Sequence, residues 1–345
     1  MSRRTSGAPL ALTMGEPAGI GGEVALLAWL ARRTKRVPPF LLIDDPERLT
    51  ALAARLGVAV PVRSVREPAE AAALFATALP VLPEVVPRPV EPGRPDPANG
   101  RAVIAAIARA VDLCRAGLAS AVVTNPIHKK SLYDAGFRHP GHTEFLAELA
   151  GVAAPVMMLA VPGLRVVPVT VHLPLAEALH SLDGRAIVRC GRVTAEALAR
   201  DFGIRDPRMA VAGLNPHAGE SGGMGKEELE MIAPAIDELC ASGIRARGPL
   251  PADTLFHPRA RARYDAALCM YHDQALIPLK TIDFDHGVNV TLGLPFVRTS
   301  PDHGTAFDIA GTGTASPESL VAALTMAAEM AQRRSASTSP RPAFA

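Results

Sequence analysis

The sequence predicts an α/β protein with a mostly parallel central sheet. Apolar runs that suit buried strands occur at Leu10 to Thr13, Phe40 to Ile43 and Ser120 to Thr124. Between them lie helical patterns, the clearest being Asn99 to Arg115, where apolar residues recur at helical spacing. Strands that alternate with helices in this way are typical of a parallel sheet covered by helices.

Length and composition set further limits. The 345 residues suffice for two domains of ordinary size, and 48% hydrophobic residues is ample for packed cores. The formal net charge of +2, with acids and bases interspersed, provides no basic face for nucleic acid or an anionic membrane. The apolar stretch before Gly15 is too short for a signal segment or a membrane span, so we expect a cytoplasmic protein. Four widely spaced cysteines without a Cys-x-x-Cys pair indicate core thiols.

A glycine-rich turn, Met14 to Gly22, links the first strand to a helix expected from about Glu23 to Arg33. Such a turn can direct backbone N–H groups toward an anion, or it can simply let strand and helix pack closely, and both roles stay open. Asp44 and Asp45 after the second strand would suit dinucleotide binding. However, Val24 stands where a Rossmann fingerprint needs its third glycine, so we expect no such fingerprint.

The densest polar stretch lies near the C-terminal end. It comprises Tyr271 to Lys280, Gly287 to Arg298 and Asp302 to Asp308, and it follows the apolar run Ala266 to Met270. Because α/β proteins bind ligands at the carboxyl ends of their strands, we expect a binding site here. Its imidazoles, acids, amides and two cations, Lys280 and Arg298, suit a phosphorylated small molecule.

Three histidines share one setting, because His172, His217 and His272 each follow an apolar run that reads as a strand. Neutral imidazoles are good ligands for zinc-like ions, and three of them with an open position make a catalytic site. Each could instead be an ordinary loop residue. Thr143, next to His142, could likewise cap a helix or offer its hydroxyl to a ligand.

Seven motifs, spread from about Leu10 to Arg333, carry a family resemblance. They are Gly15-Glu-Pro-Ala-Gly-Ile-Gly21, Gly141-His-Thr-Glu-Phe145, Val171-His-Leu-Pro174, Gly213-Leu-Asn-Pro-His-Ala-Gly-Glu220, Gly248-Pro-Leu-Pro-Ala-Asp-Thr254, Tyr271-His-Asp-Gln274 and Gly287-Val-Asn-Val-Thr-Leu-Gly-Leu-Pro295. Together they closely resemble the 4-hydroxythreonine-4-phosphate dehydrogenase family of pyridoxal phosphate biosynthesis. Asp302 to Gly311 is similar to the adenosine-binding loop of the isocitrate and isopropylmalate dehydrogenases, whose fold this family shares and which bind NAD without a Rossmann fingerprint.

The resemblance implies a homodimer of two-domain α/β/α subunits, with the active site near the subunit interface. We place one domain at residues 1–125 and 297–334 and a central domain with dimer contacts at 126–296. A disordered tail is expected at 335–345. The resemblance implies that the metal is bound by His172, His217 and His272, and that His272 reaches the partner's site. It implies that the substrate is bound by His142, Thr143, Lys280, Asn289 and Arg298. For the cofactor it implies His303 and Asp308.

The implied reaction is oxidation of 4-phosphohydroxy-L-threonine at C3 by NAD or NADP, with one zinc, magnesium or cobalt ion per site, followed by decarboxylation. Asp253 and Asp273 are the candidate general bases, with salt bridging as their alternative role. Ser221 and Ala275 to Pro278 depart from the family pattern. The second departure leaves room for related dehydrogenases of 4-phospho-threonate, 4-phospho-erythronate or an aromatic dihydrodiol dicarboxylate.

Two readings from other classes also remain. A metal-dependent phosphatase would use imidazoles and cations on a phosphorylated substrate, although two-metal hydrolases usually bring several carboxylate ligands. A pure binding module would need no metal with an open coordination position.

Overall fold

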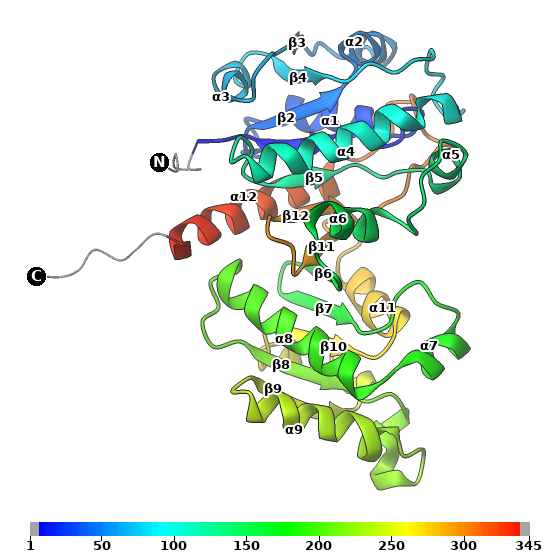
Figure 1. Ribbon diagram of the computed structural model, residues 1–345, viewed down its shortest axis with the longest axis vertical. Helices are drawn as coiled ribbons and strands as arrows, with labels where there is room; N and C mark the ends of the chain where they lie inside the picture. The colour runs from blue at the N-terminus through cyan, green and yellow to red at the C-terminus, as the bar shows by residue number, and fades with distance from the viewer. Residues whose placement is uncertain (1–6, 339–345) are drawn as a thin grey trace, which may run out of the picture. The chain divides into compact units, whose positions relative to one another are not determined.

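The computed structural model describes residues 7–338, which form two compact units (Figure 1). Unit 1 contains the residues up to Pro155 and those from Leu294 onward, and unit 2 is Val156–Gly293. Residues 126–155, which we expected in the central domain, lie in unit 1. Each unit has its own arrangement of strands and helices.

The strands of unit 1 are all parallel and lie in the order β3-β4-β2-β1-β5-β12. They are β1 (Leu10–Thr13), β2 (Phe40–Asp44), β3 (Val62–Ser64), β4 (Leu79–Pro83), β5 (Val122–Thr124) and β12 (Arg298–Pro301). The residues of β1, β2, β5 and β12 are all buried, as expected for strands with both faces covered.

Helices cover both faces of the unit 1 strands. They are α1 (Gly21–Leu30), α2 (Pro46–Arg55), α3 (Ala69–Leu74), the 3₁₀ turn η1 (Pro97–Asn99), α4 (Gly100–Arg115), α5 (Lys129–Asp134), α6 (His142–Ala150) and α12 (Glu318–Thr338). The apolar stripe of α4 packs on one face together with residues of α5 and α6. α1 and α12 contact each other on the other face, and α1 is seen behind α4 in Figure 1.

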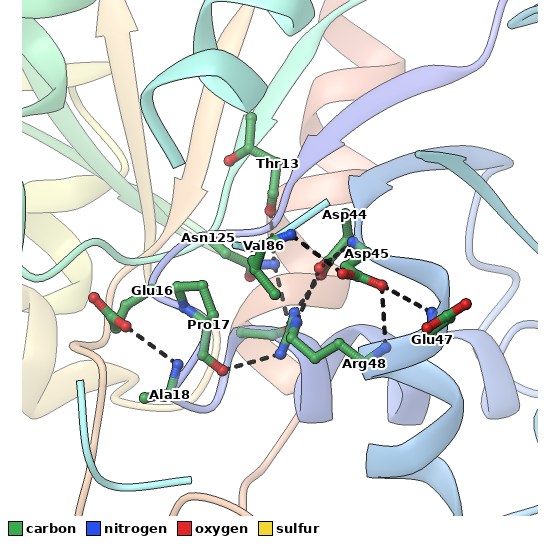
Figure 2. Close-up of polar contacts among 11 residues, drawn as sticks. Thr13, Glu16, Pro17, Ala18, Asp44, Asp45, Glu47, Arg48, Val86 and Asn125 are labelled. Atoms are coloured by element: carbon green, nitrogen blue, oxygen red, sulfur yellow. Dashed lines mark hydrogen bonds and ion pairs between the residues drawn. The ribbon is translucent and has the colours of Figure 1, made fainter. Parts of the chain in front are cut away.

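A buried ion pair fixes the start of unit 1 (Figure 2). Asp44, at the end of β2, pairs with Arg48 on α2, and Arg48 Nη1 donates to Pro17 O in the glycine-rich turn at 2.9 Å. Asp45 caps α2 by accepting from the N–H groups of Glu47 and Arg48. Asp44 and Asp45 therefore stabilise the junction of β2 with α2, and this structural role agrees with the absence of a Rossmann fingerprint.

The strands of unit 2 are mixed and lie in the order β11-β6-β7-β10-β8-β9. The pairs β11–β6 and β6–β7 are antiparallel, and β7–β10, β10–β8 and β8–β9 are parallel. The strands are β6 (Val156–Val161), β7 (Leu164–Pro168), β8 (Arg208–Ala212), β9 (Arg245–Leu250), β10 (Ala266–Cys269) and β11 (Val288–Leu292).

The helical segments of unit 2 are α7 (Leu175–Ser181), α8 (Gly184–Arg200), η2 (Pro216–Gly222), the π-helical turn η3 (Glu228–Ile232), α9 (Ala233–Ala241), the 3₁₀ turn η4 (Ala252–Thr254), α10 (Pro258–Arg261) and α11 (His272–Ile282). One core joins Ala275, Leu276 and Leu279 of α11 to side chains of β6, β7 and β10. The helices α8 and α9 pack against each other.

The expected α/β fold with a mostly parallel sheet is confirmed. α12 continues to Thr338, so residues 335–338, expected to begin a disordered tail, are helical, and the rest of that tail lies outside the described residues. Within residues 7–338, every helix is too short or too polar to cross a membrane.

Candidate functional site

Three neighbouring parallel strands of unit 2 lead to the three histidines. β7, β10 and β8 lie side by side in that order, and they are followed by His172, His272 and His217 respectively. Because the carboxyl ends of parallel strands meet at one edge, the three side chains begin at the same edge of unit 2. Each of the three histidines therefore follows a strand, as the sequence predicts, and His272 follows the central one of the three.

His172 and His272 approach each other. β7 ends at Pro168, but pairing continues beyond it, because Val169 N donates to Cys269 O at 2.8 Å and Thr170 Oγ1 donates to Met270 O at 2.9 Å. The chain then turns at His172, whose φ is +52°, and the two imidazole centroids are 5.8 Å apart. Both rings line a hollow of about 280 Å³ with Tyr271 and Asp273.

His217 lies in an unusual backbone turn. Residues 217 to 221 all have left-handed φ and ψ values, and only Gly219 among them is a glycine. A left-handed conformation costs an L-residue roughly 1–2 kcal/mol, so this turn needs strong support from its surroundings. Non-glycine residues held in this region concentrate at functional sites.

The three histidines do not make a complete metal site within one chain. Over residues 7–338, no group of three or more His, Cys, Asp or Glu side chains stands close enough together to hold an ion. The chemistry of the set suits a divalent ion, and the pair His172 and His272 could supply part of it.

One face of α11 carries His272, Leu276 and Lys280 at intervals of four residues. These residues line a second hollow, of about 450 Å³, together with Asp273, Ile277 and Thr281. Lys280 Nζ lies 5.5 Å from the ring centroid of Phe284. The helix thus presents an imidazole and an ammonium group to the same opening.

Asp273 and Asp253, the candidate bases, differ in setting. Asp273 Oδ1 is 2.7 Å from His272 Nδ1, so this carboxylate orients the neighbouring ring. Asp253 is exposed on η4, a turn that contacts η2, which carries His217. Asn289 on β11 has a buried Oδ1 without a hydrogen-bond partner in the described chain, which fits a residue that receives a ligand.

Unit 1 contains a buried cation. Arg298, the first residue of β12, is 3% exposed, and its Nη2 donates to Thr124 Oγ1 at 2.6 Å. Burial lowers the pKa of the Arg298 guanidinium to about 10, although the charge of Glu144 opposes this change. At neutral pH the group is still positive, and a buried positive charge of this kind suits an anionic ligand.

His142 lies near Arg298 in unit 1. Burial, and secondly the charge of Arg298, hold the pKa of His142 well below its usual value, so its ring is neutral at neutral pH. Its Nε2 is buried and has no hydrogen-bond partner among residues 7–338. α6 begins at His142 after Gly141, without a side-chain cap, so the expectation that Thr143 might cap this helix is wrong.

The loop after β12 contains the two predicted cofactor residues. His303 Nδ1 bonds to Gly304 O at 3.0 Å, its Nε2 is buried without a partner in the described part of the chain, and burial lowers its pKa. Asp308 is exposed. Thr305 O accepts from Ile20 N, and a Cβ on Gly19 would lie 2.9 Å from the same oxygen. The glycine-rich turn therefore serves close packing against this loop.

Three residues that bond to the predicted site residues or to the segments before them were not identified from the sequence: Thr124, Gln274 and Glu228. Thr124 was read as a strand end and Gln274 only as part of a motif. In the structure Gln274 Oε1 accepts from Met270 N at 2.7 Å, and its Nε2 donates to Gly213 O at 2.8 Å. It thereby joins the segment before His272 to the segment before His217. No local sequence signal distinguishes Glu228 from the other acids around it.

Comparison with known proteins identifies the family of this chain. The model of the family "Pyridoxal phosphate biosynthetic protein PdxA" matches residues 36–327. A 4-hydroxythreonine-4-phosphate dehydrogenase of Methylorubrum populi is 57% identical over 341 residues, covering 97% of each chain.

Solved structures are similar over nearly the whole chain. The crystal structure of 4-hydroxythreonine-4-phosphate dehydrogenase from Klebsiella pneumoniae is 38% identical with a TM-score of 0.85, covering 94% of this chain and 100% of that one. A terephthalate 1,2-cis-dihydrodiol dehydrogenase from Burkholderia xenovorans is 30% identical with a TM-score of 0.63, covering 93% and 98%. Given the match of the family model and the identity to its members, the chain belongs to the PdxA family of pyridoxal phosphate biosynthesis.

Proposed function

We propose that this protein is a 4-hydroxythreonine-4-phosphate dehydrogenase. It would oxidise 4-phosphohydroxy-L-threonine at C3, with NAD or NADP as acceptor, to 2-amino-3-oxo-4-phosphooxybutanoate, which decarboxylates to 3-amino-2-oxopropyl phosphate. The relative that is 57% identical carries this name. The structural observation with most weight is that three neighbouring strands bring His172, His272 and His217 to one edge of unit 2.

The proposed metal ligands are these three histidines. Their imidazoles suit zinc or cobalt better than magnesium, which prefers oxygen ligands. When bound, the ion would lower the pKa of the substrate hydroxyl and stabilise the charge that develops on its oxygen, while the nicotinamide takes up the hydride. The strained backbone at His172 and His217 supports a functional role for both residues.

The phosphate of the substrate would be bound by Arg298 and Lys280. Arg298 offers a planar fork in a buried setting, and Lys280 offers a flexible point charge. His142, Thr143 and Asn289 would orient the rest of the substrate. The buried Nε2 of His142 and Oδ1 of Asn289, each without a partner among the described residues, support that assignment because a bound ligand would complete their hydrogen bonds.

We assign different tasks to the two acids. Asp273 would hold His272 through Nδ1 and so leave Nε2 to face the metal, an arrangement common around ligating histidines. Asp253, on the turn next to the one with His217, is then the better candidate for the general base.

The cofactor would lie against the loop after β12, with His303 and Asp308 contacting its adenosine part. The buried Nε2 of His303 supports this placement, because it has no partner within residues 7–338. The packing of Thr305 on the glycine-rich turn would keep the loop in position for binding.

We further propose a homodimer in which His272 completes the partner's site. Leu175, which lines the 280 Å³ hollow together with His272, is 58% exposed, and Ile277 and Phe284, which follow His272 in sequence, are 64% and 72% exposed. Large apolar side chains exposed together favour an interface between subunits. A cytoplasmic location stays a prediction from the sequence.

The test is a product-resolved assay with purified protein, a divalent ion and 4-phosphohydroxy-L-threonine. The proposal expects formation of reduced NAD with equal release of carbon dioxide, and loss of both in chelator. Release of inorganic phosphate without NAD reduction would identify a phosphatase, and binding without turnover would identify a binding module. Faster turnover of an aromatic dihydrodiol dicarboxylate or of 4-phospho-threonate would favour the related dehydrogenases instead.

A further inference from the structure

A buried carboxylate lies beneath the turn that carries His217. Glu228 is 2% exposed and is the first residue of the π-helical turn η3. Its Oε1 accepts hydrogen bonds from Leu214 N and Asn215 N, each at 2.7 Å. Its Oε2 accepts from Asn215 Nδ2 at 2.9 Å. One side chain therefore binds the two residues that lead from β8 into η2.

The same carboxylate also contacts the turn itself. A Cβ on Gly219, in the middle of the left-handed residues, would lie 2.5 Å from Glu228 Oε2. A Cβ on Gly213 would lie 3.2 Å from Oε1. The carboxylate thus lies between the strand end and the turn, and a Cβ at position 219 would collide with it.

We propose that Glu228 is a positioning residue for His217, which it holds by fixing the left-handed turn. The proposal rests on the ligand role assigned to His217 above. Two of the hydrogen bonds to Glu228 are made by the backbone N–H groups of Leu214 and Asn215. They determine where the chain leaves β8, and therefore where the His217 ring begins.

Nearby acids provide matched controls. Glu230 is exposed on the same π-helical turn. Glu227 is also exposed, and it accepts from Asn215 Nδ2 at 2.8 Å. Removing the charge at either position tests whether negative charge near the turn is enough, or whether the buried contacts of Glu228 are required.

Two variants disturb the same contact from opposite sides. Glu228→Gln keeps one acceptor oxygen but turns an amide group toward the Asn215 side chain. Gly219→Ala adds a methyl group against Oε2 at a position whose φ is +77°. Both variants, wild type, His217→Ala, Glu227→Gln and Glu230→Gln would be compared as full-length proteins with native circular dichroism.

Three measurements follow: the dissociation constant for Co²⁺ from its visible absorption, amide hydrogen exchange of residues 213–221, and kcat and KM with 4-phosphohydroxy-L-threonine. For Glu228→Gln and Gly219→Ala we expect Co²⁺ binding weaker by roughly tenfold to a hundredfold, the range for residues that orient metal ligands. Exchange in 213–221 should accelerate, and kcat should fall while KM changes little. Both glutamine controls should resemble wild type.

Wild-type Co²⁺ affinity and unchanged exchange in both variants would overturn the proposal, as would equal losses in the Glu230→Gln control. The proposed function fails in a different way: wild type and His217→Ala would bind Co²⁺ equally, or wild type would not reduce NAD. In that case the hydrogen-exchange comparison decides alone whether Glu228 fixes the turn.

Discussion

Arg298 is the residue whose surroundings most clearly suit an anionic substrate. Arg298 is 3% exposed, and Thr124 Oγ1 accepts one of its hydrogen bonds. The sequence identified the residue through its motif, but its burial and its contact with Thr124 depend on β12 pairing with β5, a contact far apart in sequence. A single sequence without an alignment provides no signal for that pairing.

Replacing Arg298 should weaken binding of the phosphorylated substrate. A charge-assisted hydrogen bond to a desolvated phosphate is worth about 2 kcal/mol or more, so Arg298→Ala should raise KM by well over tenfold. Arg298→Lys should give a KM between those of wild type and Arg298→Ala, because it keeps the charge and loses the planar fork. Steady-state kinetics with Arg333→Ala, at an exposed ion pair with Glu329, is the control. Equal wild-type rates on phosphorylated and unphosphorylated 4-hydroxythreonine would show that the cation binds something else.

His142 should make stability depend on pH. Burial, followed by the charge of Arg298, lowers its pKa in the folded state, whereas the unfolded value is about 6.5. The unfolded chain therefore takes up a proton first as the pH falls, and stability should decrease from about pH 6.5 downward, by up to about 1.4 kcal/mol per pH unit. Above that pH, His142 is neutral in both the folded and the unfolded chain, so it does not make stability depend on pH.

Urea unfolding between pH 7.5 and pH 5.5, roughly one unit to either side of the unfolded-state pKa of His142, tests this expectation. Below pH 6.5, the unfolding free energy of wild type should fall more steeply with decreasing pH than that of His142→Gln. The difference in slope should approach about 1.4 kcal/mol per pH unit, the value for one proton. An identical slope in wild type and His142→Gln would contradict a lowered pKa at this position.

At the scale of elements, apolar patterning located the strands well, while their ends and the turns after them could not be predicted. The apolar run Val167 to Val171 before His172 reads as a strand, yet β7 ends at Pro168, and beyond it Val169 and Thr170 still donate hydrogen bonds to Cys269 O and Met270 O. The left-handed turn at His217 contains a single glycine, so no pattern of turn residues indicates it. The buried contacts of Glu228 and Gln274 stabilise such segments, and contacts of that kind are invisible in sequence.

The junction of β2 and α2 offers a stability test (Figure 2). Arg48 pairs with the fully buried Asp44 and also donates to Pro17 O. Removing one member of a buried pair leaves an uncompensated charge, so Arg48→Ala should lower the free energy of unfolding by about 3–5 kcal/mol. Arg192→Ala, which breaks an exposed pair with Glu238, should cost at most about 1 kcal/mol.

Chemical denaturation at neutral pH measures both Arg48→Ala and its control. Equal losses in the two variants would mean that Asp44 is neutral in the fold, or that water replaces the lost partner. Arg48→Ala should also loosen the glycine-rich turn, because the bond to Pro17 O is lost with the side chain.

For the whole molecule, alternating strand and helix patterns predicted the α/β class, and the motifs predicted the family; both are confirmed. The assembly is a different matter. The histidines of one chain make an incomplete metal set within residues 7–338, although the rings of His172 and His272 lie 5.8 Å apart. The proposed metal site therefore requires either His272 of a partner subunit or a movement of His217 toward the pair within the same chain.

Mixing two inactive variants separates these arrangements and tests the central claim, a catalytic site shared between subunits. In a heterodimer of His217→Ala and His272→Ala chains, a shared arrangement leaves one of the two sites with all three histidines. After equal mixing and confirmed subunit exchange, NAD reduction should therefore recover to about one quarter of the wild-type rate. Absence of any recovery, with heterodimers shown to form, would contradict the shared site.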